Sequence, residues 1–175
     1  MWGIPEVLPE PVRQKARGEP ILQDQQGRSV RFFADLLARQ RVLVHTTYSA
    51  CSDQCPPAMG NLLQALPLLG PQGQNLRIVS LTLTPLEDTP KQLRALADRY
   101  QLPADWLLLT GTVKAMDQIR ERLGLTSPPE ANDRTGDLSH LTVARLCDSH
   151  RVRWGHVNLL LPPRSIARMI RYEMA

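Results

Sequence analysis

The chain has 175 residues, of which 42% are hydrophobic and 22% charged, and these values suit one soluble globular domain with a sizeable core. No apolar run approaches the roughly 20 residues of a membrane span, and the N-terminal residues lack the basic-then-apolar pattern of an export signal. The net charge of +4 comes from scattered basic residues that are not interleaved with aromatics, which argues against a nucleic-acid partner.

The N-terminal part predicts an irregular lead-in followed by a hairpin. Residues 1–19 contain several prolines and a glycine, so we expect an extended arm there. The stretch "ILQDQQGRSVRF" (residues 21–32) predicts two short strands with a turn at Gln26 and Gly27. Residues 32–38 are expected to form a short helix.

The middle of the chain alternates strands and helices. Residues 41–49, "RVLVHTTYS", are β-branched and mostly apolar, which predicts a buried strand. From Pro56 onward, apolar residues recur at helical spacing, and a helix tolerates prolines in its first turn. Residues 76–83 predict a second buried strand, a helix opens at Pro90, and residues 106–111 form a short strand or turn.

The C-terminal part predicts a helix, a loop, a second hairpin and a last helix. The helix covers residues 113–123, and residues 126–139 are a polar, proline-containing loop. Residues 140–148 and 151–157 read as two strands, and a helix begins near Pro162 or Pro163. Strands that alternate with helices, without repeats or a linker, indicate a single α/β domain with a central mixed sheet flanked by helices and an N-terminal hairpin.

Two of the three cysteines form a close pair. Cys51 and Cys55 follow a predicted strand and stand at the start of a predicted helix. A helix N-terminus favours the thiolate, which is the form that attacks substrates and binds metals. The pair can therefore close a disulfide, act as a nucleophile or hold a metal, while two buried structural cysteines are the simpler alternative. Cys147 stands apart and is interpreted as a small buried hydrophobic residue.

The motif and its surroundings resemble a known family. "CSDQCPP" after a strand, with "GRSVRFFADLLARQRVLV" ahead of it, is similar to the CxxxC region of the Sco/SenC proteins. The resemblance continues through "SLTLTPLEDTPKQL", "WLLLTGT" and the histidine ahead of the terminal hairpin. It begins near Pro20 and implies a thioredoxin-like domain over residues 20–175, after the arm of residues 1–19.

The resemblance also implies a function and a third ligand. Sco/SenC proteins bind copper and serve assembly of the copper centre of cytochrome c oxidase. On this basis His140 joins Cys51 and Cys55 as a ligand of Cu(I) or Cu(II), and the protein is a metallochaperone rather than an enzyme. The expected partner is a copper-accepting protein such as a cytochrome oxidase subunit. The expected location is the periplasm or the outer side of a membrane, with any anchor lying outside this sequence.

Three other histidines compete with His140 for the role of ligand. His45 lies in the middle of a predicted strand, where a core histidine that hydrogen-bonds its surroundings is expected. His150 falls in a predicted turn and His156 in the last strand, and both are expected at the surface. Met59 offers a soft thioether four residues after Cys55, but its position in the apolar pattern predicts a core residue.

The chain departs from the family pattern at a few positions, and two other functions compete with copper binding. Ser52 replaces a common proline, Leu141 a common serine and Thr84 a common aspartate, although Asp88 is kept. The main alternative is a thiol–disulfide oxidoreductase that cycles the cysteine pair between dithiol and disulfide. The CxxxC spacing, and the lack of a proline between residues 132 and 161, weaken that alternative. A binding module without metal chemistry is the third reading.

Overall fold

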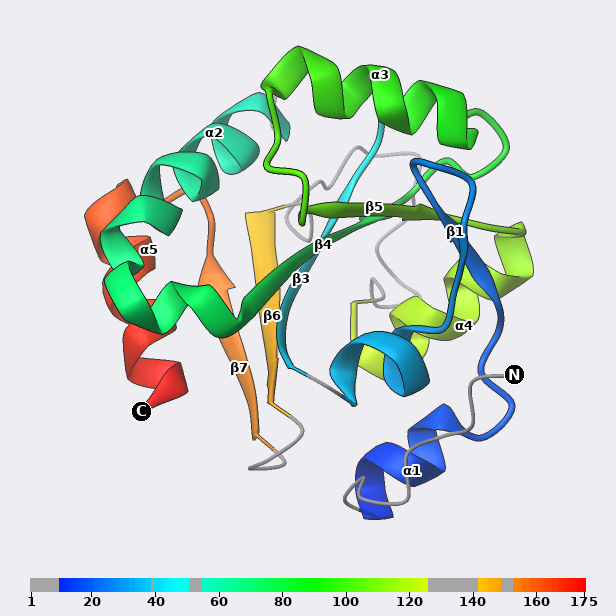
Figure 1. Cartoon of the computed structure of the whole chain (residues 1–175), viewed down its shortest axis with the longest axis horizontal. Helices are drawn as coiled ribbons and strands as arrows, with labels where there is room; N and C mark the ends of the chain where they lie inside the picture. The colour runs from blue at the N-terminus through cyan, green and yellow to red at the C-terminus, as the bar shows by residue number, and fades with distance from the viewer. Residues whose placement is uncertain (1–9, 39, 51–54, 126–141, 149–152) are drawn as a thin grey trace, which may run out of the picture.

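A single mixed sheet organises the molecule. The computed structural model describes residues 10–38, 40–50, 55–125, 142–148 and 153–175. Its seven strands lie in the order β2-β1-β5-β4-β3-β6-β7, with helices on both faces (Figure 1). The α/β class, the central mixed sheet and the N-terminal hairpin predicted from the sequence are therefore confirmed.

The N-terminal segment contains a helix that the sequence analysis missed. Helix α1 covers Glu10–Ala16, so the expectation of an extended arm was wrong for these residues. Proline is tolerated in a first turn, and the acidic first turn and basic last turn match the helix dipole. A contact distant in sequence also stabilises α1, because the Lys15 ammonium donates a 2.7 Å hydrogen bond to the carbonyl of Arg122.

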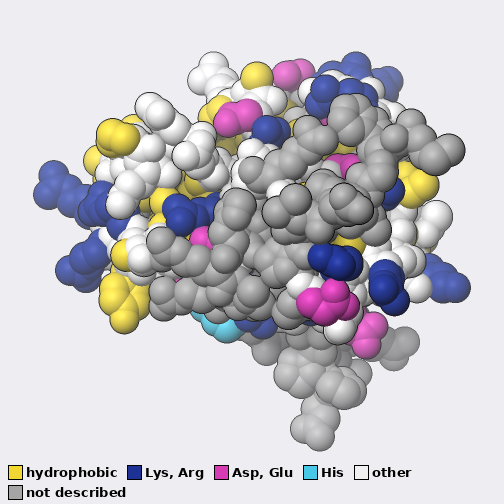
Figure 2. Space-filling view, turned by 60° about the horizontal axis from the view of Figure 1, so that its bottom comes forward, with side chains coloured by type: hydrophobic (Ala, Val, Ile, Leu, Met, Phe, Trp, Pro, Cys, Tyr) yellow, Lys and Arg dark blue, Asp and Glu magenta, His cyan; other side chains and the backbone are white. Residues whose placement is uncertain are grey.

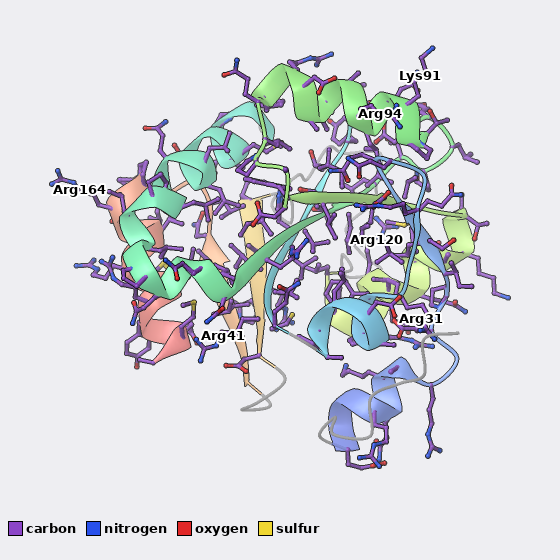
Figure 3. The ribbon with its side chains drawn as sticks, in the orientation of Figure 1. Arg31, Arg41, Lys91, Arg94, Arg120 and Arg164 are labelled. Atoms are coloured by element: carbon purple, nitrogen blue, oxygen red, sulfur yellow. The ribbon has the colours of Figure 1, made fainter. Side chains whose placement is uncertain are left out.

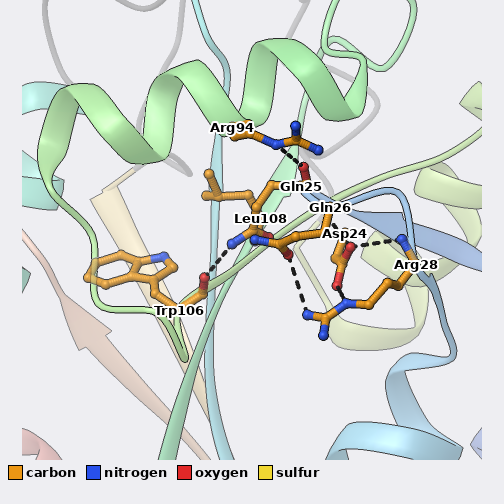
Figure 4. A network of polar contacts seen from close by, with 7 residues as sticks. All are labelled: Asp24, Gln25, Gln26, Arg28, Arg94, Trp106 and Leu108. Carbon is orange, nitrogen blue, oxygen red and sulfur yellow. Dashed lines mark hydrogen bonds and ion pairs between the residues drawn. The ribbon is translucent and has the colours of Figure 1, made fainter.

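The predicted hairpin is present and is tied to the sheet by polar contacts. Strands β1 (Leu22–Asp24) and β2 (Ser29–Val30) pair antiparallel, and Gly27 takes a φ of 79° in the turn between them. The carboxylate of Asp24 accepts the amides of Gln26 and Arg28. Gln25 donates to the carbonyl of Trp106 and accepts the amide of Leu108, which fastens the turn to β5 (Figure 4).

The central elements follow the sequence expectations closely. A short helix of the π type, η1 (Phe32–Leu37), comes after the hairpin. The three parallel strands are β3 (Arg41–Thr47), β4 (Leu76–Thr82) and β5 (Leu107–Thr110). The helices between and after them are α2 (Cys55–Ala65), α3 (Pro90–Tyr100) and α4 (Val113–Leu123). A 3-10 helix, η2 (Leu66–Asn75), follows α2; the helical apolar pattern that starts at Pro56 reached Leu69 but did not predict η2 as a separate element.

The C-terminal hairpin and helix complete the sheet and its cover. Strand β6 (Val143–Asp148) pairs antiparallel with β3 and with β7 (Arg153–Asn158), and α5 (Pro163–Met174) closes the chain. The predicted loop over residues 126–139 and most of the turn between β6 and β7 lie outside the described residues.

The sheet separates two hydrophobic layers. In β3, Val42 and Val44 point into the layer covered by α1, η1 and α4. Leu43 points into the layer covered by α2, η2, α3 and α5. This alternation follows from the two-residue period of a strand buried on both faces. Across the described stretches, none of the helices has the length and apolar character needed to cross a bilayer.

Candidate metal centre

The two strands that flank the predicted ligands in sequence, β3 and β6, meet at one end of the sheet. Cys55 is the first residue of α2, while Cys51, His140 and the side chain of Cys55 lie outside what the structure describes. Strand β3 ends at Thr47 and β6 begins at Val143. Because these neighbouring strands are antiparallel, with Val44 opposite Arg145, the end of β3 and the start of β6 lie side by side.

A buried carboxylate holds the chain just before the cysteine motif. Asp88 is fully buried between the end of β4 and the start of α3. Its carboxylate accepts the amide of Ser49 at 3.2 Å and a short hydrogen bond from the hydroxyl of the same residue. The hydroxyls of Thr82 and Thr84 also donate to it, at 2.5 and 3.1 Å.

This network fixes the backbone two residues before Cys51. A buried carboxylate is costly unless hydrogen-bond donors surround it, and here four donor groups converge on one. Thr84, one of the positions at which the sequence departs from the pattern it resembles, supplies one of these donors. An aspartate at position 84 would instead place a second carboxylate beside the first. The family segment contained Asp88, but nothing in the sequence showed that Ser49 and Thr82 converge on it.

His45 is a core histidine, as its position in the strand predicted. It is buried, and its Nε2 lies 2.7 Å from the hydroxyl oxygen of Ser80. The Nδ1 atom lies 3.2 Å from the carbonyl of Thr46, which can only accept, so Nδ1 carries the proton of the neutral ring and donates. The Nε2 atom then accepts the Ser80 hydroxyl, whose oxygen accepts the indole N–H of Trp106 at 2.8 Å. Burial lowers the pKa of His45 to about 4, so the ring is neutral and both its nitrogens are engaged.

The other Cys, Met and His residues that were predicted not to be ligands lie in the predicted environments, except His150, which is outside the described residues. Cys147 is buried opposite Val42, near the start of β3, and burial raises the pKa of its thiol. Met59 is buried, and its sulfur accepts the hydroxyl of Thr47 at 3.7 Å. His156 is exposed, whereas His150 lies outside the described residues. Within the described ranges, no group of three or more His, Cys, Asp or Glu residues could hold a metal ion.

Comparison with known proteins gives the family. The model of the family described as SCO1/SenC matches residues 12–175. The chain belongs to the SCO1/SenC family. The match starts inside α1, so the family's region extends further toward the N-terminus than the resemblance near Pro20 had suggested.

Individual members of the family are distant in sequence. A putative copper-binding protein of Stutzerimonas stutzeri is 30% identical over 93 residues, which are 53% of this chain and 44% of that protein. The chain thus matches about half the length of its curated relatives.

Solved SCO structures share the fold. Bradyrhizobium japonicum ScoI, solved with copper bound, superposes with a TM-score of 0.66 at 20% identity, over 89% of this chain and 98% of that one. BsSco superposes with a TM-score of 0.64 at 24% identity, over 88% of this chain and 90% of that one. It is described as having a disulfide switch and as a member of the Sco family of cytochrome c oxidase assembly proteins. The fold is therefore the thioredoxin-like fold of the SCO proteins.

Proposed function

We propose that the protein is a copper metallochaperone that holds one copper ion through Cys51, Cys55 and His140. Membership of the SCO1/SenC family, with a member solved with copper bound, supports this proposal. The observation that carries it is the shared edge of β3 and β6. The cysteine motif follows the end of β3 and His140 precedes the start of β6. Two segments distant in sequence are therefore joined to neighbouring strands at the same end of the sheet.

The proposed donor set fits copper. Thiolates favour Cu(I), and imidazole also suits Cu(II). The first turn of α2, which begins at Cys55, favours thiolates through its free amide groups and dipole. Structural zinc sites normally have four protein ligands, and Cys147 does not qualify as a fourth. It is buried near the start of β3, at the other end of the strand, and its raised thiol pKa keeps it protonated.

The transfer we propose is a ligand exchange without electron transfer. Each bond from Cu(I) to this chain breaks as a donor of the accepting protein forms a bond. The acceptor we propose is a copper site such as that of cytochrome c oxidase, since BsSco is described among its assembly proteins. We also propose a location outside the cytoplasm, because disulfides form and persist there and a Cys51–Cys55 disulfide would regulate copper binding.

Thiol–disulfide exchange is the second candidate, favoured by the disulfide switch described for BsSco. In that reaction the Cys51 and Cys55 thiolates reduce a partner disulfide. Two electrons pass to the partner, whose sulfurs leave as thiols, while a disulfide forms here. A pure oxidoreductase would carry out this exchange but would bind no stoichiometric copper.

Copper titration of the reduced protein under anaerobic conditions tests the proposal. We expect one Cu(I) per chain, and loss of most of the affinity in Cys51→Ser and in Cys55→Ser. His140→Ala should weaken the binding of Cu(II) more than that of Cu(I), because two thiolates can coordinate Cu(I) in a linear geometry while Cu(II) prefers further donors. The matched control is His156→Ala, at an exposed position of β7. Full stoichiometry and affinity in both cysteine variants would contradict the proposed site.

A second measurement separates the two candidate functions. Mild oxidation of the copper-free protein should form the Cys51–Cys55 disulfide and abolish Cu(I) binding, which mass mapping after alkylation would show. Reduction of an added disulfide substrate by a wild-type protein that takes up no copper would favour the oxidoreductase. A disulfide that involves Cys147 would contradict the assignment of the working pair.

A further inference from the structure

One face of the molecule carries basic side chains beside a long stretch without charge. Residues 55–75, which form α2 and η2, contain no Asp, Glu, Lys, Arg or His. Both elements pack against α5, which contains three arginines. We call the outer side of α5 together with η2 the α5 face. It lies on the left in Figure 1.

The three arginines of α5 form one stripe. Arg164, Arg168 and Arg171 are spaced at i, i+4 and i+7, which places them on the same side of a helix over about 10 Å of its axis. Arg164 and Arg168 are exposed, and Figure 3 shows Arg164 pointing away from the molecule. The guanidinium of Arg171 donates to the carbonyl of Leu68 at 2.7 Å, so the stripe borders η2.

The acidic residue of α5 does not neutralise this stripe. Glu173 is two residues beyond Arg171, on a different side of the helix, and its side chain lies over Gly155 of β7. A Cβ atom at Gly155 would come within 2.7 Å of the Glu173 carboxylate oxygen. The carboxylate is therefore turned toward the sheet edge, and the positive charge of the stripe faces outward.

Large apolar side chains are exposed next to the arginines. Leu68 is 44% exposed and lies beside Arg171, while Tyr172 is 72% exposed and follows Arg168 by four residues. Figure 2 shows basic side chains projecting near hydrophobic ones at its left edge, the side of α5 in Figure 1. Basic residues mixed with exposed leucine and an aromatic ring are typical of protein surfaces that lie on a membrane.

We propose that the α5 face binds the surface of an anionic lipid membrane. The arginines of the stripe contact lipid phosphates, while Leu68 and Tyr172 enter the boundary between headgroups and acyl chains. An acidic protein or a nucleic acid would need further polar groups beside the arginines to bind. Apolar side chains occupy those positions instead, so a membrane surface fits this face better. This inference goes beyond the copper role and does not depend on it.

Vesicle sedimentation of the metal-free protein tests this proposal. We expect binding to phosphatidylcholine vesicles that contain phosphatidylglycerol, no binding to vesicles of phosphatidylcholine alone, and weakening with salt. The double variant Arg164→Gln/Arg168→Gln should bind about 25-fold more weakly, from roughly fivefold per basic residue. The matched control is Lys91→Gln/Arg99→Gln, which removes the same charge from exposed positions of α3 and should keep most of the affinity.

The apolar contribution is tested separately and the fold is monitored by circular dichroism. Tyr172→Ser should weaken binding to the anionic vesicles without any change in net charge. Absence of vesicle binding at low salt, as expected if the face instead meets an acidic protein, would overturn the proposal. Equal losses in the two double variants would also overturn it, since net charge rather than this face would then control binding.

Discussion

The buried carboxylate of Asp88 offers the sharpest test of how the fold supports the cysteine motif. Asp88→Asn keeps the size of the side chain but removes its charge and turns one acceptor oxygen into a donor. The hydroxyls of Thr82 and Thr84 both donate to the same carboxylate oxygen. If the amide group takes that place, both hydroxyls must turn and accept instead, and Ser49 keeps an acceptor only in the remaining oxygen, Oδ1.

The cost follows from the burial of each donor. A hydrogen bond to a charged acceptor contributes roughly 1.5–3 kcal/mol, and a buried group left without a partner costs a similar amount. Ser49 and Thr84 are half-buried, so water can replace part of what they lose, whereas Thr82 is fully buried. We therefore expect the free energy of unfolding to fall by about 2–3 kcal/mol in Asp88→Asn and by about 3–5 kcal/mol in Asp88→Ala.

Loss of this network should also reach the proposed copper site. Ser49 is two residues before Cys51, and without its anchor this segment must be ordered when copper binds. Each 1.4 kcal/mol of ordering lowers the affinity about tenfold. Copper affinity should fall in Asp88→Asn although no proposed ligand is altered, and the visible absorption of the Cu(II)–thiolate bond should weaken.

Urea unfolding monitored by circular dichroism measures the stability, and copper titration of the folded protein measures the affinity. Glu87→Gln is the matched control, since it makes the same chemical change at the exposed neighbouring residue and should alter neither quantity. If Asp88→Asn and Glu87→Gln unfold at the same urea concentration, the reasoning about the network is wrong. If Asp88→Asn is destabilised but binds copper as the wild type does, the network supports the fold alone.

Three further predictions concern two buried groups and a half-buried residue beside Asp88. The pKa of His45 lies below its unfolded value of 6.5, at about 4, so the unfolded chain binds its proton first as the pH falls. Stability from this group should be complete above pH 6.5 and decline by about 3 kcal/mol as the pH falls to 4, a slope that His45→Gln should lack in pH-dependent unfolding. Cys147 should resist alkylation until the protein unfolds, because its thiol is buried and its pKa is raised; rapid labelling of the native protein would contradict its placement. Thr84→Asp should destabilise the protein at neutral pH by about 1–3 kcal/mol, because it replaces a donor to Asp88 by a second carboxylate, and unchanged urea unfolding would argue against this.

Local patterns in the sequence were sufficient for most of the elements. Helix α4 has the predicted bounds, because an N-capping threonine, a helical apolar period and a C-terminal glycine agree there. The buried strands β3 and β4 were recognisable because a strand covered on both faces is a continuous apolar run. The buried, hydrogen-bonded state of His45 followed from the same pattern, since a strand interior admits a histidine only when its ring is hydrogen-bonded.

Other elements depend on contacts that local patterns do not contain. The sequence predicted no separate element over residues 66–75, yet η2 forms where it packs against α5 and Arg171 reaches Leu68. Helix α1 is short, and its contact with Arg122 joins residues 107 positions apart. Short helices are marginal on their own, so tertiary packing decided whether these two would form.

The sequence by itself determined which groups are candidates for the proposed chemistry: a pair of thiols at a predicted helix start, a late histidine, and an aspartate in a segment that resembles the family. Only the tertiary structure decided how the neighbouring strands and side chains are arranged. It brought the end of β3 beside the start of β6 and joined Ser49 to Asp88 across 39 positions. It also turned Glu173 away from the arginines of α5. The physical reason is that a side chain's identity sets which atoms it can bind, whereas chain crossings and burial set which partners come within reach.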